Sequence, residues 1–409
     1  MSEGRRVPKL RFLGFEGEWE ERKLESLFEE RHEYSIACDE YPRFSFTIEE
    51  GVIDPEERKT NKRDFLIKDE ENKKYLITEF NDIIYNPANV VFGAIHRNKR
   101  GKGCLSPIYR IFVTSQNPVF MEYLVRRDSF IKAISQLTEG TVVKLRTLKP
   151  EAFLNIKVFI PAEMEEQNKI GTILSFVDDQ IAKAQNELEK WIELKKGMLQ
   201  KMFPKEGESV LEIRFPGYTD PWELRKFSEG VSEIGDGLHG TPTYSDCGNI
   251  YFINGNNLVD GKIVIGVETK KVDANQQSEA DKCLDDTTIL MSINGTIGNL
   301  AYYSGEKLML GKSAAYIKVS EFDKRFVYAY LQAPSVQGYF MDNVTGTTIK
   351  NLGLKAIREM KMLIPQDVEE QKRIGEFFDN LDKLISLYQC ECDKWKELKK
   401  GLLQQMFIA

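Results

Sequence analysis

Two segments of the chain carry apolar residues in steps of three and four, with Glu, Lys and Gln between them. They cover residues 165–203 and 369–407. An apolar repeat of 3.5 residues held over more than four heptads is typical of a coiled coil. Each segment begins shortly after a proline, which the first turn of a helix tolerates. At 1.5 Å per residue, each predicted helix would be about 58 Å long.

The two predicted helices have nearly the same apolar seam. Antiparallel pairing with each other is the simplest arrangement that buries both seams, and a helix lying on its own domain is the alternative. The residues expected to pair the helices are Ile170, Leu174, Val177, Ile181, Leu188 and Trp191 in the first segment, and Ile374, Phe378, Leu381, Ile385, Trp395 and Leu398 in the second.

The helical segments belong to a longer internal duplication. Residues 7–24 return as residues 210–227 at an offset of 203, and residues 160–203 return as residues 364–407 at an offset of 204. Such agreement indicates two tandem half-molecules. Between the repeated ends, residues 30–138 and 233–344 show little resemblance, so each pair of repeated segments (the frame) encloses a different variable region (the insert).

The variable regions mix short β-rich runs with glycine turns and brief helices, which predicts an α+β (mixed α/β) fold. A pseudo-two-fold relates the two variable domains, and two long antiparallel coiled-coil helices separate them. The predicted boundaries are 1–160 for the first variable domain, 161–206 for the central helix, 207–364 for the second variable domain and 365–409 for the C-terminal helix.

The repeated elements resemble those of one known family, the specificity subunits of type I restriction-modification systems. They are the opening Val-Pro-x-Leu-Arg-Phe-x-Gly-Phe, the Ile-Pro-x-x-x-x-Glu-Gln-x-x-Ile-Gly before each helix, and the Lys-Lys-Gly-x-Leu-Gln-x-Met-Phe at each helix end. Residues 235–244 with 294–298, and residues 85–87 with 93–95 and 106–109, resemble two types of target-recognition domain.

This resemblance implies a DNA-binding subunit in which each recognition domain reads one half of a bipartite target. The helices would set the spacer between the half-sites and dock two methyltransferase (modification) subunits. Motor-nuclease (restriction) subunits would join them where the system restricts DNA. The resemblance places S-adenosylmethionine in the methyltransferase subunits and ATP with Mg²⁺ in the motor-nuclease subunits, and it implies no cofactor in this chain.

Motifs for catalysis are incomplete, which favours a non-catalytic chain. Residues 305–313 superficially resemble a phosphate-binding loop, but five residues separate the two glycines where four are needed. Asn86-Pro87 lacks the second proline and the aromatic residue of an adenine-methylase motif. The 3 histidines and 6 cysteines show no metal-site spacing, so no metal is expected.

Charge is distributed unevenly along the 409 residues. The net charge of −7 argues mildly against a stand-alone DNA binder. Residues 12–57 hold 15 acidic and 4 basic side chains, whereas residues 91–150 hold 11 basic and 3 acidic ones. The basic region could face a polyanion, or the two regions could be solvated faces of opposite sign. No apolar run is long enough to span a bilayer, so the expected location is the cytoplasm, without a membrane partner.

Candidate contacts to double-stranded DNA follow from the need for phosphate anchors and for polar groups at base edges. The first domain offers a glycine-bounded basic loop and a nearby basic zone, although a solvated hairpin tip is the alternative. Its candidates are His96, Arg97, Asn98, Lys99, Arg100, Lys102, Arg126, Arg127, Lys144 and Arg146.

The second domain holds 9 basic and 13 acidic residues over 235–345, so fewer phosphate contacts are expected there. Turn formation would explain its asparagines equally well. Its candidates are His239, Thr241, Thr243, Tyr244, Asn254, Asn256 and Asn257.

Two other classes of function stay open. A non-catalytic coiled-coil scaffold would bind proteins through its variable domains, and the basic segment argues against it. An enzyme fused to a recognition module is less well supported because its motifs are missing.

Overall fold

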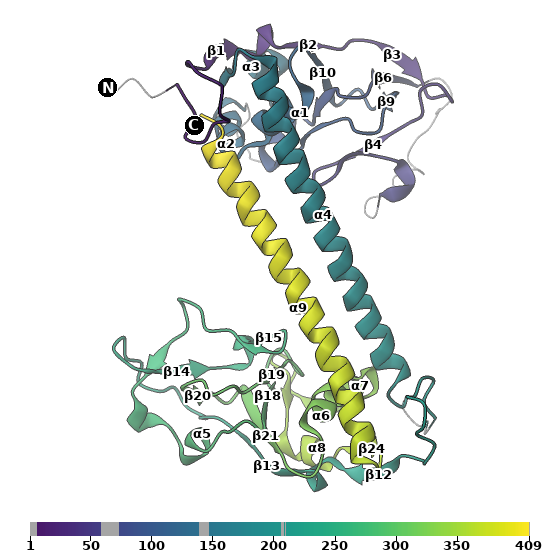
Figure 1. The fold of residues 1–409 in the computed structure, drawn as a ribbon, viewed down its shortest axis with the longest axis vertical. Helices are drawn as coiled ribbons and strands as arrows, with labels where there is room; N and C mark the ends of the chain where they lie inside the picture. The colour runs from purple at the N-terminus through teal and green to yellow at the C-terminus, as the bar shows by residue number, and fades with distance from the viewer. Residues whose placement is uncertain (1–5, 59–72, 139–146, 206–207, 209, 409) are drawn as a thin grey trace. The chain divides into compact units, whose positions relative to one another are not determined.

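The structure is a computed structural model that describes residues 6–58, 73–138, 147–205, 208 and 210–408. Contacts group the chain into two compact units. Unit 1 comprises residues 1–183 and 391–409, and unit 2 comprises residues 184–390. The long helices α4 (Met164–Lys201) and α9 (Val368–Gln405) each contribute one part to either unit (Figure 1). The sequence-based boundaries treated the two helices as separate segments, whereas each helix packs as part of both units.

Unit 1 is built on a four-stranded antiparallel sheet in the order β2-β10-β7-β8. A three-stranded sheet β3-β6-β9 and the pairs β4-β5 and β1-β11 complete its strands. Their bounds are β1 Glu20–Lys23, β2 Phe28–Glu30, β3 Tyr34–Ile36, β4 Ser45–Thr47, β5 Gly51–Ile53, β6 Lys74–Thr78, β7 Ile83–Tyr85, β8 Ile95–Arg97, β9 Gly103–Leu105, β10 Arg110–Thr114 and β11 Lys157–Ile160. The short helices are α1 Pro118–Arg126, α2 Asp128–Leu137 and α3 Pro150–Leu154.

Unit 2 has a sheet of the same form, in the order β13-β21-β18-β19, with every neighbouring pair antiparallel. The sheet β17-β14-β20 and the pairs β15-β16, β22-β23 and β12-β24 accompany it. The bounds are β12 Glu223–Lys226, β13 Val231–Asp236, β14 Ile250–Ile253, β15 Leu258–Val259, β16 Lys262–Ile263, β17 Lys271–Val272, β18 Thr288–Ser292, β19 Leu300–Tyr302, β20 Leu308–Leu310, β21 Ala314–Val319, β22 Val344–Thr345, β23 Asn351–Leu352 and β24 Lys361–Ile364. Its short helices are α5 Glu279–Lys282, α6 Lys324–Leu331, α7 Pro334–Asp342 and α8 Leu354–Glu359.

The central sheets show that the two variable regions share one framework although their sequences diverge. In both units the first strand of the sheet pairs with the last, the last pairs with the second, and the second pairs with the third. The predicted α+β class is confirmed. The inserts share the central sheet and differ in the sheets beside it, because β3-β6-β9 is antiparallel throughout whereas β14 and β20 pair in parallel.

A buried carboxylate explains the repeated opening motif and the repeated Glu-Gln. In unit 1, Glu166 is 1% exposed and accepts two hydrogen bonds of 2.8 Å from Arg11 and one of 3.3 Å from the indole of Trp19. In unit 2, Glu370 accepts bonds of 2.7 and 2.8 Å from Arg214 and one of 3.4 Å from Trp222. A two-pronged Arg–carboxylate contact is strong and geometrically specific, so it fixes the start of each repeat on its long helix.

The glutamine and glycine of the same motif hold a second helix. Gln167 accepts a hydrogen bond from the Asn117 amide and donates one to the carbonyl of Pro161. Asn117 in turn caps α1 by accepting from the amide of Phe120 at 2.8 Å. A Cβ on Gly171 would lie 3.2 Å from the Asn117 side chain, so the glycine lets α1 start close to α4.

The Met-Phe at the end of each long helix is a core element. Phe407 lies in the core of unit 1, with ring centroids 6.2 Å from Trp19 and 5.3 Å from Phe120. Phe203 occupies the matching place in unit 2, with centroids 6.4 Å from Trp222 and 5.5 Å from Phe378. The end of one repeat's helix therefore helps to close the core of the unit built on the other repeat.

The predicted antiparallel pairing of the helices is confirmed within each unit. In unit 1 the start of α4 shares a core with the end of α9, and Asp178 pairs with Lys399 at 2.6 Å. In unit 2 the end of α4 packs on the start of α9, and Lys195 forms an ion pair with Asp382. The two ion pairs occupy equivalent places, because Asp178 and Asp382, and Lys195 and Lys399, are 204 residues apart.

One predicted seam residue is wrong. Leu398 is 45% exposed, whereas the next residue, Lys399, faces α4 and forms an ion pair with Asp178. The other predicted seam residues are buried or half-buried: Ile170, Leu174, Val177, Ile374, Phe378 and Leu381 are buried, and Ile181, Leu188, Trp191, Ile385 and Trp395 are half-buried. Over the described residues, no helix is long and apolar enough to cross a membrane.

Candidate nucleic-acid interface

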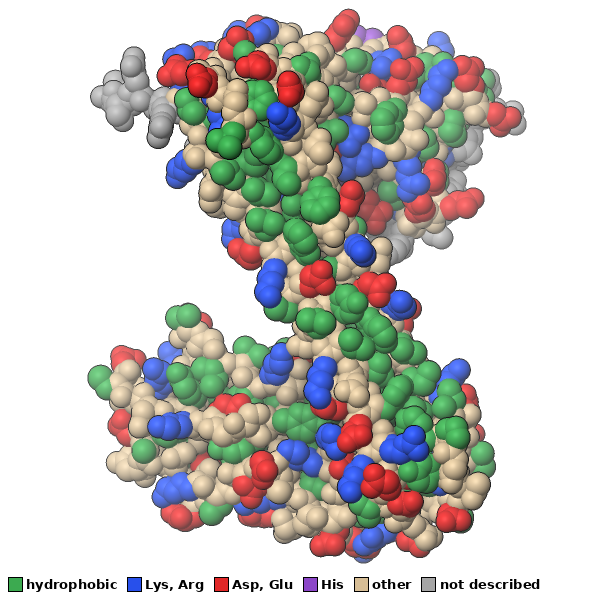
Figure 2. Space-filling model, viewed as in Figure 1, with side chains coloured by type: hydrophobic (Ala, Val, Ile, Leu, Met, Phe, Trp, Pro, Cys, Tyr) green, Lys and Arg blue, Asp and Glu red, His purple; other side chains and the backbone are tan. Residues whose placement is uncertain are grey.

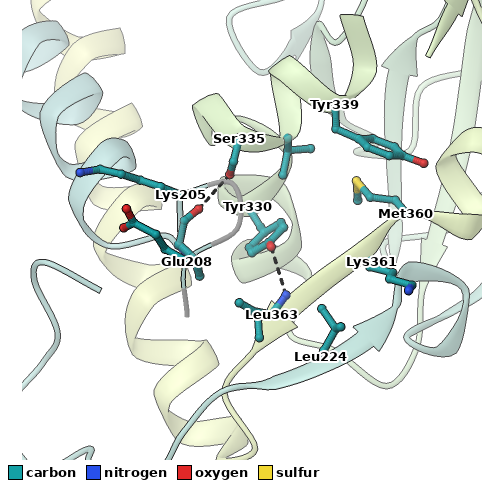
Figure 3. Close-up of a pocket in the computed structure, with 11 residues that line it drawn as sticks. Lys205, Glu208, Leu224, Tyr330, Ser335, Tyr339, Met360, Lys361 and Leu363 are labelled. Atoms are coloured by element: carbon teal, nitrogen blue, oxygen red, sulfur yellow. Dashed lines mark hydrogen bonds between the residues drawn. The ribbon is translucent and has the colours of Figure 1, made fainter. Parts of the chain in front are cut away.

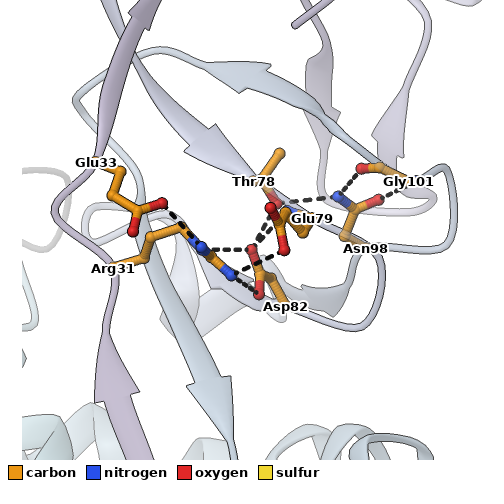
Figure 4. A network of polar contacts seen from close by, with 7 residues as sticks. All are labelled: Arg31, Glu33, Thr78, Glu79, Asp82, Asn98 and Gly101. Atoms are coloured by element: carbon orange, nitrogen blue, oxygen red, sulfur yellow. Dashed lines mark hydrogen bonds and ion pairs between the residues drawn. The ribbon is translucent and has the colours of Figure 1, made fainter. Parts of the chain in front are cut away.

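The basic loop of unit 1 lies between β8 and β9 and is held by buried polar side chains (Figure 4). Asp82 is 3% exposed and accepts hydrogen bonds from Arg31, at 3.1 Å from both Nε and Nη2, and from Thr78 at 3.2 Å. Asn98, fully buried, donates to Thr78 and to the carbonyl of Gly101. Burial raises the pKa of Asp82, and the Arg31 guanidinium opposes that rise.

Two of the proposed DNA contacts are internal supports of this loop. The side-chain oxygen of Asn98 accepts from the amides of Arg100 and Gly101, at 2.9 and 3.1 Å. His96 is 3% exposed, with Nε2 2.7 Å from the carbonyl oxygen of Ile48. Burial lowers the pKa of His96 to about 4, so the ring is neutral near pH 7. Neither side chain offers a polar group at the surface, because each is buried and already hydrogen-bonded.

Three of the proposed cations converge on one buried carboxylate. Glu122 is 2% exposed and lies 3.1 Å from Arg97, 3.5 Å from Lys99 and 3.3 Å from Arg126. A single negative charge therefore anchors three positive ones, which leaves a net positive site at this corner.

The remaining cations of the loop pair with the acidic N-terminal region. Arg100 lies 3.4 Å from Asp54 and also pairs with Glu57, and Lys102 lies 2.5 Å from Glu40. The basic and acidic segments thus partly neutralise each other, and charges of both signs are mixed over the visible face of unit 1 (Figure 2).

Arg127 has a structural role. It donates to the carbonyls of Leu124 at 3.2 Å and Ile408 at 2.7 Å, and its guanidinium lies 4.7 Å from the ring centre of Phe407. Burial lowers its pKa to about 10. Lys144 and Arg146 lie outside the described residues.

In unit 2 the structure brings together the two segments that resemble a recognition domain. The cavity at these loops measures about 630 Å³. Its polar lining consists of Asp236 and His239 from the first segment, Asn294 from the second, and Lys312 and Asn351, and its apolar lining consists of Ile293, Ile349, Leu352 and Leu354.

Backbone contacts fix these loops to one another. Leu238 donates to Leu310 at 2.7 Å, Lys312 donates to Leu238 at 3.0 Å, and a bridge joins Asn294 to Asn351. A Cβ on Gly237 would lie 2.0 Å from the Leu310 carbonyl oxygen, so this close approach needs glycine. The result is a hollow of mixed polar and apolar lining with a supported wall, and a rigid wall of this kind suits the precise placement of polar groups.

The cavity holds both donors and acceptors. His239 is exposed, with Nε2 2.8 Å from Asp236, and the side-chain amide of Asn294 donates to the Lys312 carbonyl at 3.0 Å. Sequence reasoning proposed His239 as a contact but not Asp236, Asn294, Lys312 or Asn351. Asp236 lies three residues before His239 in the same segment. The pairing of separated loops brings Lys312 and Asn351 to the cavity, and no local pattern in the sequence signals that.

The other proposed residues of unit 2 divide into two groups. Asn254 and Asn257 shape a turn, because Asn254 accepts from Ser313 at 3.0 Å and Asn257 donates to the Val264 carbonyl at 3.0 Å. The remaining candidates have exposed side chains and stay open as contacts: Thr241, Thr243, Tyr244 and Asn256.

A second cavity of unit 2, of about 430 Å³, lies where the segment after α4 passes over α7 and β24 (Figure 3). Ser335 donates to the Pro204 carbonyl at 3.0 Å, and the Leu363 amide donates to the Tyr330 hydroxyl at 3.2 Å. Burial raises the pKa of Tyr330 to about 12. The bond from Ser335 attaches the connecting segment to α7, and none of the proposed DNA contacts lines this cavity.

Comparison with known proteins agrees with this picture. Residues 222–392 match the sequence profile of the type I restriction modification DNA specificity domain. The MjaVIII type I restriction enzyme specificity subunit of Methanocaldococcus jannaschii is 25% identical over 356 residues, covering 83% of this chain and 80% of that protein. A second protein of that organism, provisionally named as the MjaX specificity subunit, is 24% identical over 314 residues, covering 71% and 68%.

The fold is similar to the crystal structure of a type I restriction-modification S subunit from M. genitalium. The TM-score is 0.65 at 16% identity, with 98% of this chain and 99% of that chain covered. Residues 222–392 thus match a DNA specificity domain, and the fold is shared with the M. genitalium protein. Over most of its length the chain is similar to specificity subunits of type I restriction-modification systems, as its repeated motifs indicated.

Proposed function

We propose that this chain is the non-catalytic DNA-reading subunit of a type I complex, and that each unit reads one half of a bipartite target. The observation that carries the proposal is one sheet framework present twice with unlike loops. Two units of identical specificity would need matching loops, whereas the loops that line the cavity of unit 2 have no sequence counterpart in unit 1.

Two methyltransferase subunits would dock on the helices, with S-adenosylmethionine bound in those subunits. Motor-nuclease subunits with ATP and Mg²⁺ would join where the system restricts. The helices α4 and α9 would set the spacer, because each contributes residues to both units. The relatives named above are specificity subunits, which supports this assignment without identifying the partners.

The cavity of unit 2 is the proposed base-reading site. An asparagine amide can make two hydrogen bonds with adenine, and a lysine ammonium can donate to guanine O6 or N7. Asn294, Asn351 and Lys312 line the cavity and could supply these groups. Each well-formed contact of this type is worth about 1–3 kcal/mol of discrimination between bases.

The test is methylome sequencing of cells that express the chain with its partner subunits. We expect Asn294→Ala with Lys312→Ala to relax one half of the methylated motif and to leave the other half unchanged. Lys282→Ala, a change of an exposed lysine on α5, is the matched control and should leave both halves unchanged. Simultaneous relaxation of both halves would contradict the two-reader assignment.

A further inference from the structure

A hollow in unit 1 gathers positive side chains from elements far apart in the sequence. Its volume is about 560 Å³, and it lies between the α1–α2 corner and the last turns of α9. Asp128 is the single acidic residue in its lining. The basic residues are Arg126, Arg127, Lys132, Lys396, Lys399 and Lys400.

Half of these cations have a carboxylate partner. Arg126 shares Glu122 with Arg97 and Lys99, Lys399 pairs with Asp178, and Lys400 lies 3.9 Å from Glu397. Among the ion pairs of the described residues, none involves Arg127, Lys132 or Lys396. The hollow therefore combines a guanidinium held by backbone carbonyls with two exposed lysines that have no ion-pair partner.

The corresponding corner of unit 2 shows that the shared fold does not need these charges. The caps Asn117 of α1 and Asp323 of α6 are equivalent, and counting from them places Gln332 and Ala333 where Arg126 and Arg127 stand. At the offset of 204, Lys396 corresponds to Ile192. Three of the charges are thus particular to unit 1, in a chain with a net charge of −7. Gathering like charges is unfavourable unless an anion is bound for part of the time.

We propose that this hollow binds backbone phosphates of duplex DNA. The inference rests on the proposed function and extends it to an anchor on helix α9, outside the variable loops. A phosphate diester carries its charge on exposed oxygens, which suits a fixed guanidinium flanked by mobile ammonium groups. The contact would position unit 1 on DNA without reading sequence, as phosphate contacts generally do.

The test measures binding of the purified full-length chain to a 30-base-pair duplex of mixed sequence over a series of salt concentrations. Lys396→Gln with Lys400→Gln removes two exposed charges from the hollow and leaves the Lys399 ion pair intact. The matched control, Lys372→Gln with Lys383→Gln, makes the same charge change at exposed positions of the same helix.

We expect the salt dependence of log K to become shallower by about 1–2, since each lost phosphate contact removes about 0.9 from the slope. Affinity near 0.1 M salt should fall about three- to tenfold, and the control should match the unchanged chain. Circular dichroism should show the same fold in all three proteins.

The outcomes separate the two proposals. A wild-type chain with no affinity for duplex DNA, alone or with its partners, overturns the proposed function. Binding with a slope that the Lys396/Lys400 variant leaves unchanged overturns the phosphate site and leaves the proposed function standing. Loss of binding to polyglutamate with an unchanged DNA slope would assign the hollow to an acidic protein surface and overturn the inference.

Discussion

Four helix glycines occupy equivalent positions in the two repeats but have different surroundings. Ideal Cβ atoms at Gly197 and Gly401 would meet no atom within 4 Å among the described residues. At Gly171 a Cβ would lie 3.2 Å from Asn117 Oδ1 and 3.3 Å from the Phe120 nitrogen. At Gly375 the matching distances fall to 2.7 Å from Asp323 Oδ1 and 2.6 Å from the Phe326 nitrogen.

The expected effects of alanine substitution follow from these distances. Alanine favours a helix interior by about 1 kcal/mol over glycine, so Gly197→Ala and Gly401→Ala should each stabilise the fold by about that amount. At Gly171 this gain and the tight contact should nearly cancel. At Gly375 the methyl group must displace backbone and the N-cap of α6, which should cost more than the helix gain and destabilise unit 2 by about 1–3 kcal/mol.

Urea unfolding of the full chain gives the order of stability, and hydrogen exchange locates the effect. We expect faster exchange at the start of α6 in Gly375→Ala and little change at the start of α1 in Gly171→Ala. Equal stability of the Gly375→Ala and Gly401→Ala proteins would refute the packing argument. If Gly401→Ala is more stable but methylates poorly with its partners, the glycine is retained for contact with another subunit.

Three further outcomes are expected. Burial lowers the pKa of His96 to about 4, so the folded state disfavours protonation of this ring and the chain loses stability as the pH drops below about 6.5. Urea unfolding should show that the free energy of unfolding falls by about 2 kcal/mol from pH 7 to pH 5, and His96→Gln should lack this loss. Asp382→Ala should destabilise the chain more than Asp178→Ala in the same assay, because Lys195 is 14% exposed and Lys399, the partner of Asp178, is 27% exposed. Insertion of four residues after both Gln185 and Gln389 lengthens each helix by about 6 Å and turns it by about 40°. Methylome sequencing should then show the proposed half-sites about one base pair further apart, and an unchanged spacer would show that the helices do not set it.

The repeated frame could be predicted because its evidence lies in the sequence itself. The duplication, the heptad seam and the prolines before each helix defined α4 and α9 to within a few residues. Leu398 was misassigned because a seam that alternates steps of three and four allows either of two neighbouring residues at each turn. In the structure Lys399 is the residue that faces α4, although its charge favoured the outer face of the helix.

The common sheet and the true state of the basic loop could not be predicted. Short strands with divergent sequences carry no pairing information, so the shared order of β2-β10-β7-β8 and β13-β21-β18-β19 appears only in three dimensions. The carboxylates that pair with the loop cations, among them Glu122 and Glu40, are 25 residues away from Arg97 and 62 residues away from Lys102. Charge counted along the chain therefore overstated the positive face.

The division between repeated and variable residues has a physical basis. The clamp of Arg11 and Trp19 on Glu166, and its counterpart on Glu370, lie at helix starts, and none of these residues lines the cavity of unit 2. The Met-Phe ends fill the unit cores in the same way. Because these contacts stabilise each unit independently of its loops, loop residues such as Asn294 and Lys312 can change without loss of the frame. A chain built this way can change the loops of one unit while the fold, the helix pairing and the other unit stay the same.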